Sequence, residues 1–301
     1  MNIGQQRNRH INALCPLLGY SRQAFYQHKR VIEKEILQYD LVIQQVLLIR
    51  ERQKKIGTRK LLTVLGPFFK QHGISIGRDA LFNLLAENNL LIRKRSRKVP
   101  RTTFSDHWMR KYPNLIEGML VHAPNVLWVS DITYVTLKDG FGYLSLVTDA
   151  YSRKIVGYCL SRTLAAEGCV KALKMALRQL PTGSLLTHHS DRGCQYCSTE
   201  YVEQLTAKNI AISMTQNSDP RENAIAERVN GIIKLEFLET DNCSFSETNN
   251  QVKQAIFIYN NERLHSSIEM QTPNQAHSMN GPLKRHWKSY YSSKNKEVAM
   301  T

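Results

Sequence analysis

Residues 126–135 read VLWVSDITYV, a run of β-branched and aromatic residues that a single carboxylate, Asp131, interrupts. Two more runs of similar composition follow, GYLSLVTD at 142–149 and KIVGYCL at 154–160. Short polar segments, KDG at 138–140 and YSR at 151–153, separate the three runs. Runs of this kind bounded by turn residues are typical of strands, so the sequence predicts three antiparallel strands joined by short turns.

Helical and strand patterns alternate after this point. The pattern predicts a helix at 165–180, a strand at 185–189, a helix at 199–208, a strand at 210–214 and a long helix at about 223–238. The order βββαβαβα favours an α/β fold in which helices flank a mixed five-stranded sheet. A further helix is predicted at 252–264, and the residues beyond 281 form a basic tail of weak pattern.

Charge is distributed unevenly along the 301 residues. The chain has 41 Lys and Arg against 25 Asp and Glu, a formal charge of +16, which favours a polyanionic partner. Residues 1–120 carry 22 Lys and Arg against 8 Asp and Glu, whereas residues 121–301 carry 19 against 17. This asymmetry places a domain boundary near residue 120 and predicts that the first part contacts DNA phosphates.

The first 120 residues are predicted to be all-α. A short helix at 14–18, a turn at Gly19 and a second helix at 22–29 capped by Ser21 resemble a helix-turn-helix. A second module of the same kind, with apolar helix faces at 61–68 and 80–85, follows it. We therefore expect helix-turn-helix segments at 1–40 and 41–120, the second ending in a basic linker, then a catalytic core at 121–280 and a tail at 281–301. The linker residues expected to contact DNA are Arg93, Lys94, Arg95, Arg97 and Lys98.

Three carboxylates stand where metal-dependent chemistry would need them. Asp131 lies within the first strand, Asp191 follows the strand at 185–189, and Glu227 lies near the start of the long helix. Each residue alone is better explained as a strand-end or solvated acid. Together, two Asp and one Glu converging at strand ends can hold a pair of divalent cations about 4 Å apart, which suits in-line phosphoryl displacement.

The long helix carries a polar stripe and two rival acids. Asn223, Glu227, Asn230 and Lys234 follow a spacing of 4, 3 and 4 residues, so they share one helix face. Glu236 and Glu239 lie roughly 13 Å or more further along, at 1.5 Å per residue, and rank below Glu227 as a third ligand. Asp149, at the end of the second strand, is expected to have a turn role.

Two of the six cysteines, Cys194 and Cys197, have the Cys-x-x-Cys spacing and follow His188-His189. A zinc site is one reading of these residues, and ordinary reduced thiols are the other. A set of ligands crowded into ten residues around Asp191 would be cramped, which favours the thiol reading.

The ordered motifs of residues 13–276 strongly resemble the bacterial insertion-sequence transposases of the second-reading-frame type, whose DDE catalytic core is retroviral-integrase-like. The matching segments are WVSDITY at 128–134, HSDRG at 189–193, Asn223-Ala224 with Glu227, KLE at 234–236, Tyr259-Asn260, and Arg263 with His265. Many relatives have Asp where Glu222 stands, so no role is carried over to that position.

This resemblance implies a ribonuclease-H-like core with Asp131, Asp191 and Glu227 as ligands of Mg²⁺, for which Mn²⁺ can substitute. It implies cleavage and joining of double-stranded DNA at the terminal inverted repeats of an element and at target DNA. DNA contacts are expected at Asn223, Lys234, Arg263 and His265. The expected partners are further copies of the chain on DNA and an upstream-frame protein or fusion.

A DNA-binding regulator and a nuclease for RNA–DNA hybrids are the two alternatives to a transposase. A DNA-binding regulator with a decayed core would not need the acid triad at this spacing, and a nuclease for RNA–DNA hybrids would not need the basic helical half. No stretch reaches the roughly 18 apolar residues of a membrane span, and the N-terminus lacks a secretory pattern. We therefore expect a cytoplasmic, nucleoid-associated bacterial protein.

Overall fold

The computed structural model describes residue 11 and residues 14–92, 108–216 and 220–283. The chain divides into two units, Met1–Lys94 and Arg95–Thr301, each with its own buried core. This division lies upstream of the charge boundary near residue 120, because the segment after residue 108 packs on the second unit. There the backbone N–H of Leu115 donates to Ser213 Oγ at 2.8 Å, and Met214 donates to the carbonyl of Pro113 at 3.2 Å.

The first unit is helical. Its elements are α2 (Arg22–Arg52), α3 (Thr58–Val64), α4 (Gly66–His72) and α5 (Arg78–Glu87). Ser21 caps α2 as expected, since its hydroxyl accepts from the N–H of Ala24 at 3.0 Å. The prediction of a short helix at 22–29 is wrong: α2 continues for 31 residues because no Gly or Pro interrupts it. It therefore also runs across the expected segment boundary at residue 40.

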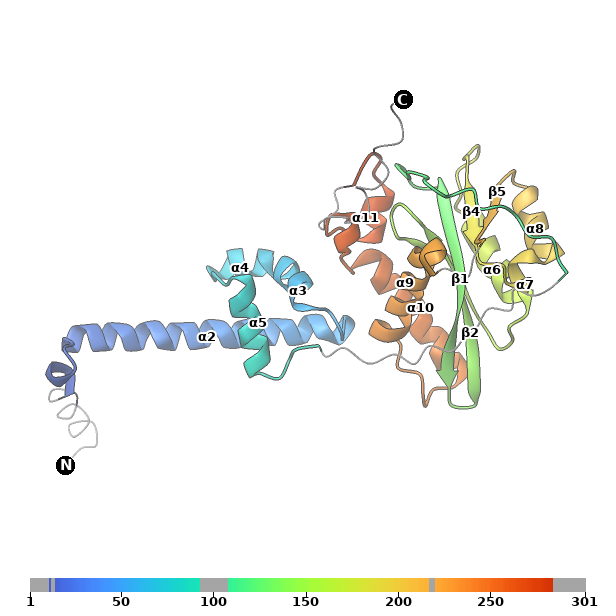
Figure 1. Ribbon diagram of the computed structural model, residues 1–301. Coiled ribbons are helices and arrows are strands. Elements are labelled where there is room, and N and C mark those ends of the chain that lie inside the picture. Colours follow the sequence, from blue (N-terminus) through green and yellow to red (C-terminus); the bar gives the residue numbers. More distant parts are fainter. Residues whose placement is uncertain (1–10, 12–13, 93–107, 217–219, 284–301) are drawn as a thin grey trace, which may run out of the picture. The chain divides into compact units, whose positions relative to one another are not determined.

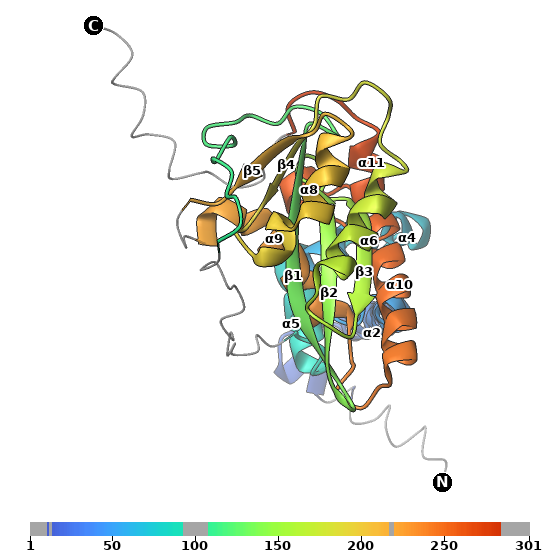
Figure 2. The same ribbon diagram turned by 90° about the vertical axis from the view of Figure 1, so that its right-hand side faces the viewer.

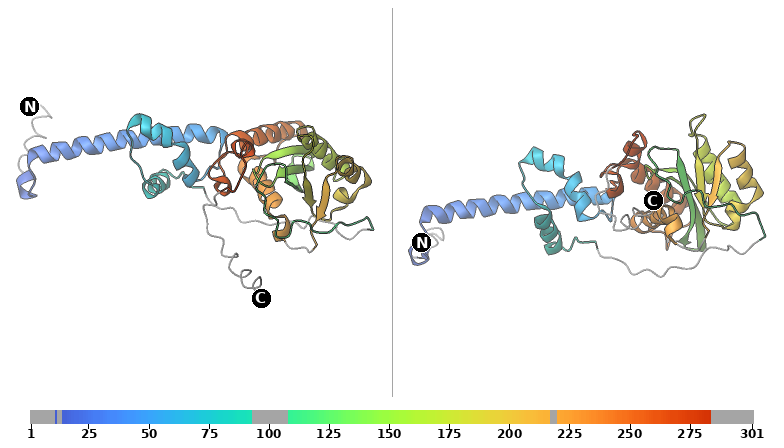
Figure 3. Two further views of the ribbon diagram at one scale, coloured as in Figure 1. Left: turned by 90° about the horizontal axis from the view of Figure 1, so that it is seen from above. Right: turned by 45° about the horizontal axis from the view of Figure 1, so that its top comes forward.

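The core of this unit lies on the second half of α2, where α3, α4 and α5 pack (Figures 1 and 3). Val42 and Val46 of α2 are fully buried against Leu61, Leu81 and Leu85. Gly73 ends α4 in the left-handed conformation, at φ 61°, which turns the chain toward α5. The α4–α5 pair thus has the helix-turn-helix order expected of the second module.

The second unit contains a five-stranded mixed sheet, as predicted. Its strands are β1 (Leu127–Leu137), β2 (Gly140–Asp149), β3 (Ile155–Ser161), β4 (Thr187–Ser190) and β5 (Ala211–Met214), in the order β3-β2-β1-β4-β5. The first three are antiparallel, and β4 and β5 run parallel to β1. Figure 2 shows the strands side by side.

Helices cover both faces of this sheet (Figure 1). The first group comprises α6 (Ala166–Leu177), α7 (Cys194–Cys197) and α8 (Thr199–Thr206). The second comprises η1 (Pro220–Asn223), α9 (Ala224–Ile232), the π-helical turn η2 (Ile233–Phe237), α10 (Phe245–Asn261), η3 (Ser266–Ile268) and α11 (Pro273–His277). The helix predicted at 223–238 is therefore three consecutive elements, and the helix predicted at 252–264 begins at Phe245, where Ser244 and Glu247 form a capping box.

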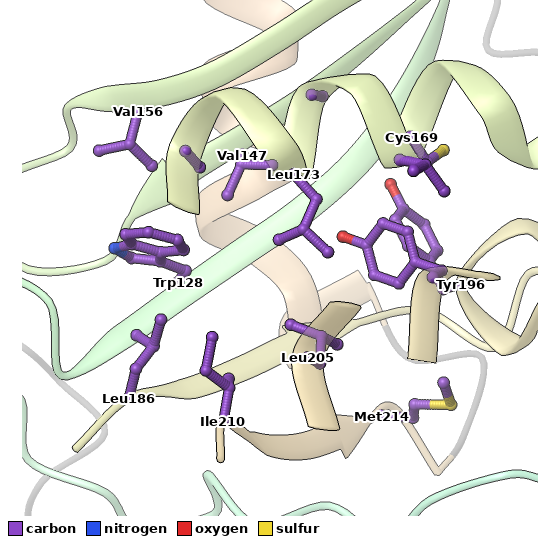
Figure 4. Packing of buried hydrophobic residues seen from close by; sticks show 14 of the residues in the cluster. Trp128, Val147, Val156, Cys169, Leu173, Leu186, Tyr196, Leu205, Ile210 and Met214 are labelled. Atoms are coloured by element: carbon purple, nitrogen blue, oxygen red, sulfur yellow. The ribbon is translucent and has the colours of Figure 1, made fainter. Parts of the chain in front are cut away.

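Alternate residues of β1 serve the two faces, as the period of a strand requires. Trp128 is fully buried with Leu173 of α6 and Leu205 of α8 (Figure 4). Val135 packs instead in the cluster formed with α9 and α10. Asp131 has the parity of Val135, so the sheet turns its carboxylate toward the face that α9 covers. None of the described helices is long and apolar enough to cross a membrane.

Candidate active site

Asp131 lies in the middle of β1, opposite Leu146 of β2. Two hydrogen bonds fix its carboxylate. Oδ1 accepts from the backbone N–H of Ile132 and Oδ2 accepts from Asn230 Nδ2, both at 2.8 Å. Because Asn230 belongs to α9, the second bond ties this helix directly to the acid.

Asp191 comes immediately after β4, which pairs in parallel with β1. The register aligns Val129 with His189, so Asp131 and Asp191 follow at equal distances along neighbouring strands. The Asp191 Oδ1 atom accepts from the N–H of Gly193 at 3.0 Å. A Cβ atom at Gly193 would stand 3.0 Å from the same oxygen, so only glycine fits beside this carboxylate without displacing it.

The negative charge of Asp191 acts on the carboxylate of Asp131, in agreement with the strand register. Two causes raise the pKa of Asp131 to about 7. The larger is burial, and the second is the negative charge of Asp191. The hydrogen bonds from Asn230 and Ile132 act in the opposite direction, and Glu227 adds a smaller upward contribution. A cation beside Asp131 and Asp191 would offset both the burial and the repulsion, and oxygen donors of this kind suit Mg²⁺ or Mn²⁺.

Glu227 lies in the first turn of α9 with an exposed side chain. Helix α9 packs against β1, and Asn230, one turn further on, reaches Asp131. Within residues 14–92, 108–216 and 220–283, no three His, Cys, Asp or Glu side chains are arranged to hold a metal ion together. The structure thus brings Asp131 and Asp191 together and places Glu227 on the adjoining helix.

Two asparagines of the polar stripe donate hydrogen bonds to β1 at and beside Asp131. Asn223 is buried, and its Nδ2 donates to the carbonyl of Ser130 at 3.0 Å, next to Asp131 in the strand. Asn230 is 4% exposed and donates to Asp131 itself. The predicted stripe was the signal for Asn230, but a stripe shows only a shared face and not what that face contacts. Asn223, expected as a DNA contact, holds the backbone of β1 in this structure.

Arg263 and His265 lie inside the domain instead of on a DNA-binding surface. Arg263 is 4% exposed, and its guanidinium forms two bonds of 2.8 Å with the carboxylate of Glu236. Its Nη1 lies 2.9 Å from His265 Nε2, which is also buried. These contacts join η2 to the end of α10, so both side chains have partners within the domain, and their expected DNA contact stays a prediction. Glu236 is held in the same ion pair, away from the role of a third ligand.

Of the remaining basic residues expected to contact DNA, Lys234 lies among the described residues and the linker residues do not. Lys234 is half-buried in η2, on the same helical stripe as Glu227. The expected linker contacts Arg93, Lys94, Arg95, Arg97 and Lys98 lie outside the described residues, as does most of the tail.

The Cys-x-x-Cys segment forms the short helix α7, and both of its cysteines are free thiols. The neighbouring histidines are engaged elsewhere. His188 Nε2 lies 2.8 Å from Ser130 Oγ and 2.9 Å from Tyr201 Oη, and His189 Nδ1 lies 2.9 Å from Ser213 Oγ. Burial lowers the pKa of His188 to about 3 and that of His189 to about 4, so both stay neutral. This arrangement supports the thiol reading over the zinc reading.

Asp149 has the turn role expected of it. Its carboxylate accepts from the N–H and the hydroxyl of Ser152 at 2.8 and 2.7 Å and from the N–H of Asn125 at 2.7 Å. Because Asp149 is fully buried and saturated by these donors, it stabilises the β2–β3 turn.

Comparison with known proteins identifies similar chains. Two models described as integrase core domain match residues 121–220 and 208–273. The chain is 35% identical over 266 residues to the insertion element IS600 uncharacterized 31 kDa protein of Shigella sonnei, covering 85% of this chain and 94% of that protein. It is 33% identical over 189 residues to the putative transposase for insertion sequence element IS986/IS6110 of Mycobacterium tuberculosis, covering 61% and 66%. The catalytic core domain of HTLV-2 integrase in complex with magnesium matches 52% of this chain and 97% of its own length, with 21% identity and a TM-score of 0.41.

Proposed function

Because the chain belongs to the bacterial insertion-sequence transposases that carry an integrase core domain, we propose that Asp131, Asp191 and Glu227 direct its metal-dependent cleavage and joining of DNA strands. The family acts in DNA transposition and integration, so the protein is a polynucleotidyl transferase. The observation that supports the residue assignment is the parallel register of β1 and β4, which aligns Val129 with His189, so that Asp131 and Asp191 each follow two residues later.

The donor set fits a divalent cation. Asp131 and Asp191 provide carboxylate oxygens on β1 and just after the neighbouring strand β4, and Glu227 lies on the helix that Asn230 ties to Asp131. When bound, Mg²⁺ or Mn²⁺ would polarise the phosphate and stabilise charge on the attacking and leaving oxygens. The hydrogen bonds from Asn230 and Gly193 keep the two Asp carboxylates oriented for this task.

Neither step of the reaction requires a side chain as nucleophile. In cleavage, a water oxygen bonds to phosphorus and the bond from phosphorus to the leaving sugar oxygen breaks. The water loses a proton, and the leaving sugar oxygen gains one. In joining, the hydroxyl of a cut DNA end takes the place of water at a target phosphate. The role of the protein groups is to position the phosphate and the attacking oxygen.

The first unit is proposed to recognise the element ends. It contains the α4–α5 helix pair, and residues 1–94 carry 16 Lys and Arg against 6 Asp and Glu. A helix-turn-helix of this order places its second helix, here α5, in the major groove. We further propose that several copies act together on DNA, with an upstream-frame protein or fusion as a further partner.

Conservative substitution of each acid tests the assignment. Asp131→Asn, Asp191→Asn and Glu227→Gln should each lower Mg²⁺-dependent strand cleavage by about a thousandfold, because each removes a charge that supports several kcal/mol of transition-state stabilisation. Glu236→Gln, in the following turn η2, should keep most activity, with urea unfolding to show that loss of its ion pair with Arg263 has not unfolded the domain. Loss of activity in Glu236→Gln with full activity in Glu227→Gln would show that the third acid is misassigned.

A further inference from the structure

Helix α7 holds a pair of thiols that the proposed reaction does not use. Cys194 and Cys197 stand at its two ends, three residues apart, and both are reduced. Residues with this spacing in a helix share one face, with Cβ atoms about 5–6 Å apart. A disulfide needs Cβ atoms about 3.5–4.5 Å apart, so a small tightening of α7 would bring the two sulfur atoms within bonding distance.

The surroundings of the two thiols differ. Cys197 is 7% exposed, and its Sγ lies 3.7 Å from Met214 Sδ in the core. Burial, followed by the charge of Asp191, raises the pKa of Cys197 to about 11, so at neutral pH it is a thiol that must lose its proton as it attacks. Cys194 is only half-buried and is the member of the pair that a small reagent in solution can reach. An accessible attacking thiol beside a sheltered resolving thiol is the arrangement of a reversible redox pair.

Gly193 connects this pair to Asp191. Its N–H donates to Asp191 Oδ1 at 3.0 Å, while its carbonyl accepts from the N–H of Cys197 at 3.2 Å. The residue has no slack on the side of the acid, since a Cβ there would stand 3.0 Å from the Asp191 oxygen. Gly193 is therefore bonded both to Asp191 and to the backbone of Cys197, which connects the geometry of α7 to the donor that orients Asp191.

We propose that Cys194 and Cys197 form a reversible disulfide with peroxide-class oxidants and that this bond suppresses strand cleavage by displacing Asp191. The second half of the proposal rests on the proposed role of Asp191. In the first step Cys194 sulfur bonds to a peroxide oxygen, the O–O bond breaks, and one water leaves, giving a sulfenic acid. Cys197 sulfur then bonds to Cys194 sulfur, the S–O bond breaks, and a second water leaves. Two thiols and one hydrogen peroxide thus give one disulfide and two waters.

The covalent step can be tested without any activity assay. Trypsin cleavage after Arg192 and Lys208 releases residues 193–208, a peptide with these two cysteines and no other. Full-length protein treated with hydrogen peroxide should yield this peptide lighter by two hydrogen atoms, and dithiothreitol should restore the mass. A peptide whose two thiols both remain open to alkylation after peroxide would overturn the proposal.

Activity then tests the connection to Asp191. Peroxide should lower Mg²⁺-dependent strand cleavage by about a hundredfold, the cost of a misplaced reacting group, and dithiothreitol should restore it. Cys194→Ser and Cys194→Ala should resist peroxide, whereas Cys243→Ser, which removes a half-buried thiol outside α7, should stay sensitive. Equal inhibition of the Cys194 variants and wild type, or a disulfide without inhibition, would refute the connection. Reduced wild type that is no more active than Asp131→Asn would instead count against the proposed function, and the peptide mass would still decide whether the thiol pair forms.

Discussion

At the scale of single residues, the surroundings of Asp131 disfavour the charged form of its carboxylate. Asp131 is half-buried in β1 near Asp191, and the donors Asn230 and Ile132 favour its charged form. A charge in such a place is retained at a cost to the fold. The cost should be visible in the pH dependence of stability.

The direction of that dependence follows from the raised pKa. Folding shifts the pKa of Asp131 upward to about 7. The contribution of Asp131 to the free energy of unfolding is therefore fully present below its pKa in the unfolded chain and is lost as pH rises through about 7. In a chelating buffer, Asp131→Asn should match wild type near pH 4 and exceed it at pH 8 by on the order of a few kcal/mol. Thermal or urea unfolding of both proteins measures this. A difference that does not change with pH would show that Asp131 ionises normally.

The sequence identified residues by motif better than it identified their contacts. Asp131 could be placed within the first strand and Asp191 just after a later one, because strand patterns are local and the two residues interrupt or follow them. The bond between Asn230 and Asp131 could not be found, because the spacing of 4, 3 and 4 fixes a helix face but not the neighbour of that face. Arg263 and His265 follow a helix in polar sequence, as solvated cations do. Only the fold shows that Arg263 is buried between Glu236 and His265.

At the scale of elements, patterns gave the strands more accurately than the helices. The runs at 126–135 and 142–149 correspond to β1 and β2, since β-branched alternation and turn residues act locally. Helix α2 continues beyond the predicted end at residue 29 because no Gly or Pro follows to interrupt it. The helix predicted at 223–238 changes to a π-helical turn at Ile233, a local widening of the helix that periodicity does not encode.

The region around η2 offers a matched test of two cations. Lys234 is half-buried on the stripe of Glu227, whereas Arg263 is buried with Glu236. Lys234→Ala should lower the salt dependence of DNA binding by about one unit, as loss of one phosphate contact requires. Arg263→Ala should leave that slope unchanged and lower the free energy of unfolding by about 3 kcal/mol, since it strands a partly buried carboxylate.

Gel-shift titrations over a range of salt, together with urea unfolding, separate the two effects. A lower salt slope in Arg263→Ala without loss of stability would return Arg263 to the DNA surface. An unchanged slope in Lys234→Ala would make that side chain an ordinary solvated one.

At the scale of the whole molecule, most of the excess positive charge precedes the sheet that carries the three acids. Residues 1–101 carry 20 Lys and Arg against 6 Asp and Glu, whereas residues 102–301 carry 21 against 19. The first group contains α2 to α5 with their own core, and the second contains the sheet and all three acids. Recognition of DNA and cleavage of DNA should therefore be separable.

Fragments cut after Arg101 test this separation, because the cut leaves the basic run with the first unit and the segment from residue 108 with the second. The fragment 1–101 should bind duplex DNA, prefer element ends over scrambled duplex, and lose affinity steeply with salt. The fragment 102–301 should fold and bind duplex weakly. End-specific binding by the second fragment, with none by the first, would transfer recognition to the core.

The central claim is that Asp131, Asp191 and Glu227 form one metal site, and the location of bound Mn²⁺ tests it most directly. Anomalous scattering from crystals of the full-length protein grown with Mn²⁺ should place manganese against the carboxylates of Asp131 and Asp191, with Glu227 turned toward the same ions. Crystals of Asp131→Asn under the same conditions should lose that signal. Manganese bound only elsewhere, or bound at this site equally well in Asp131→Asn, would contradict the account.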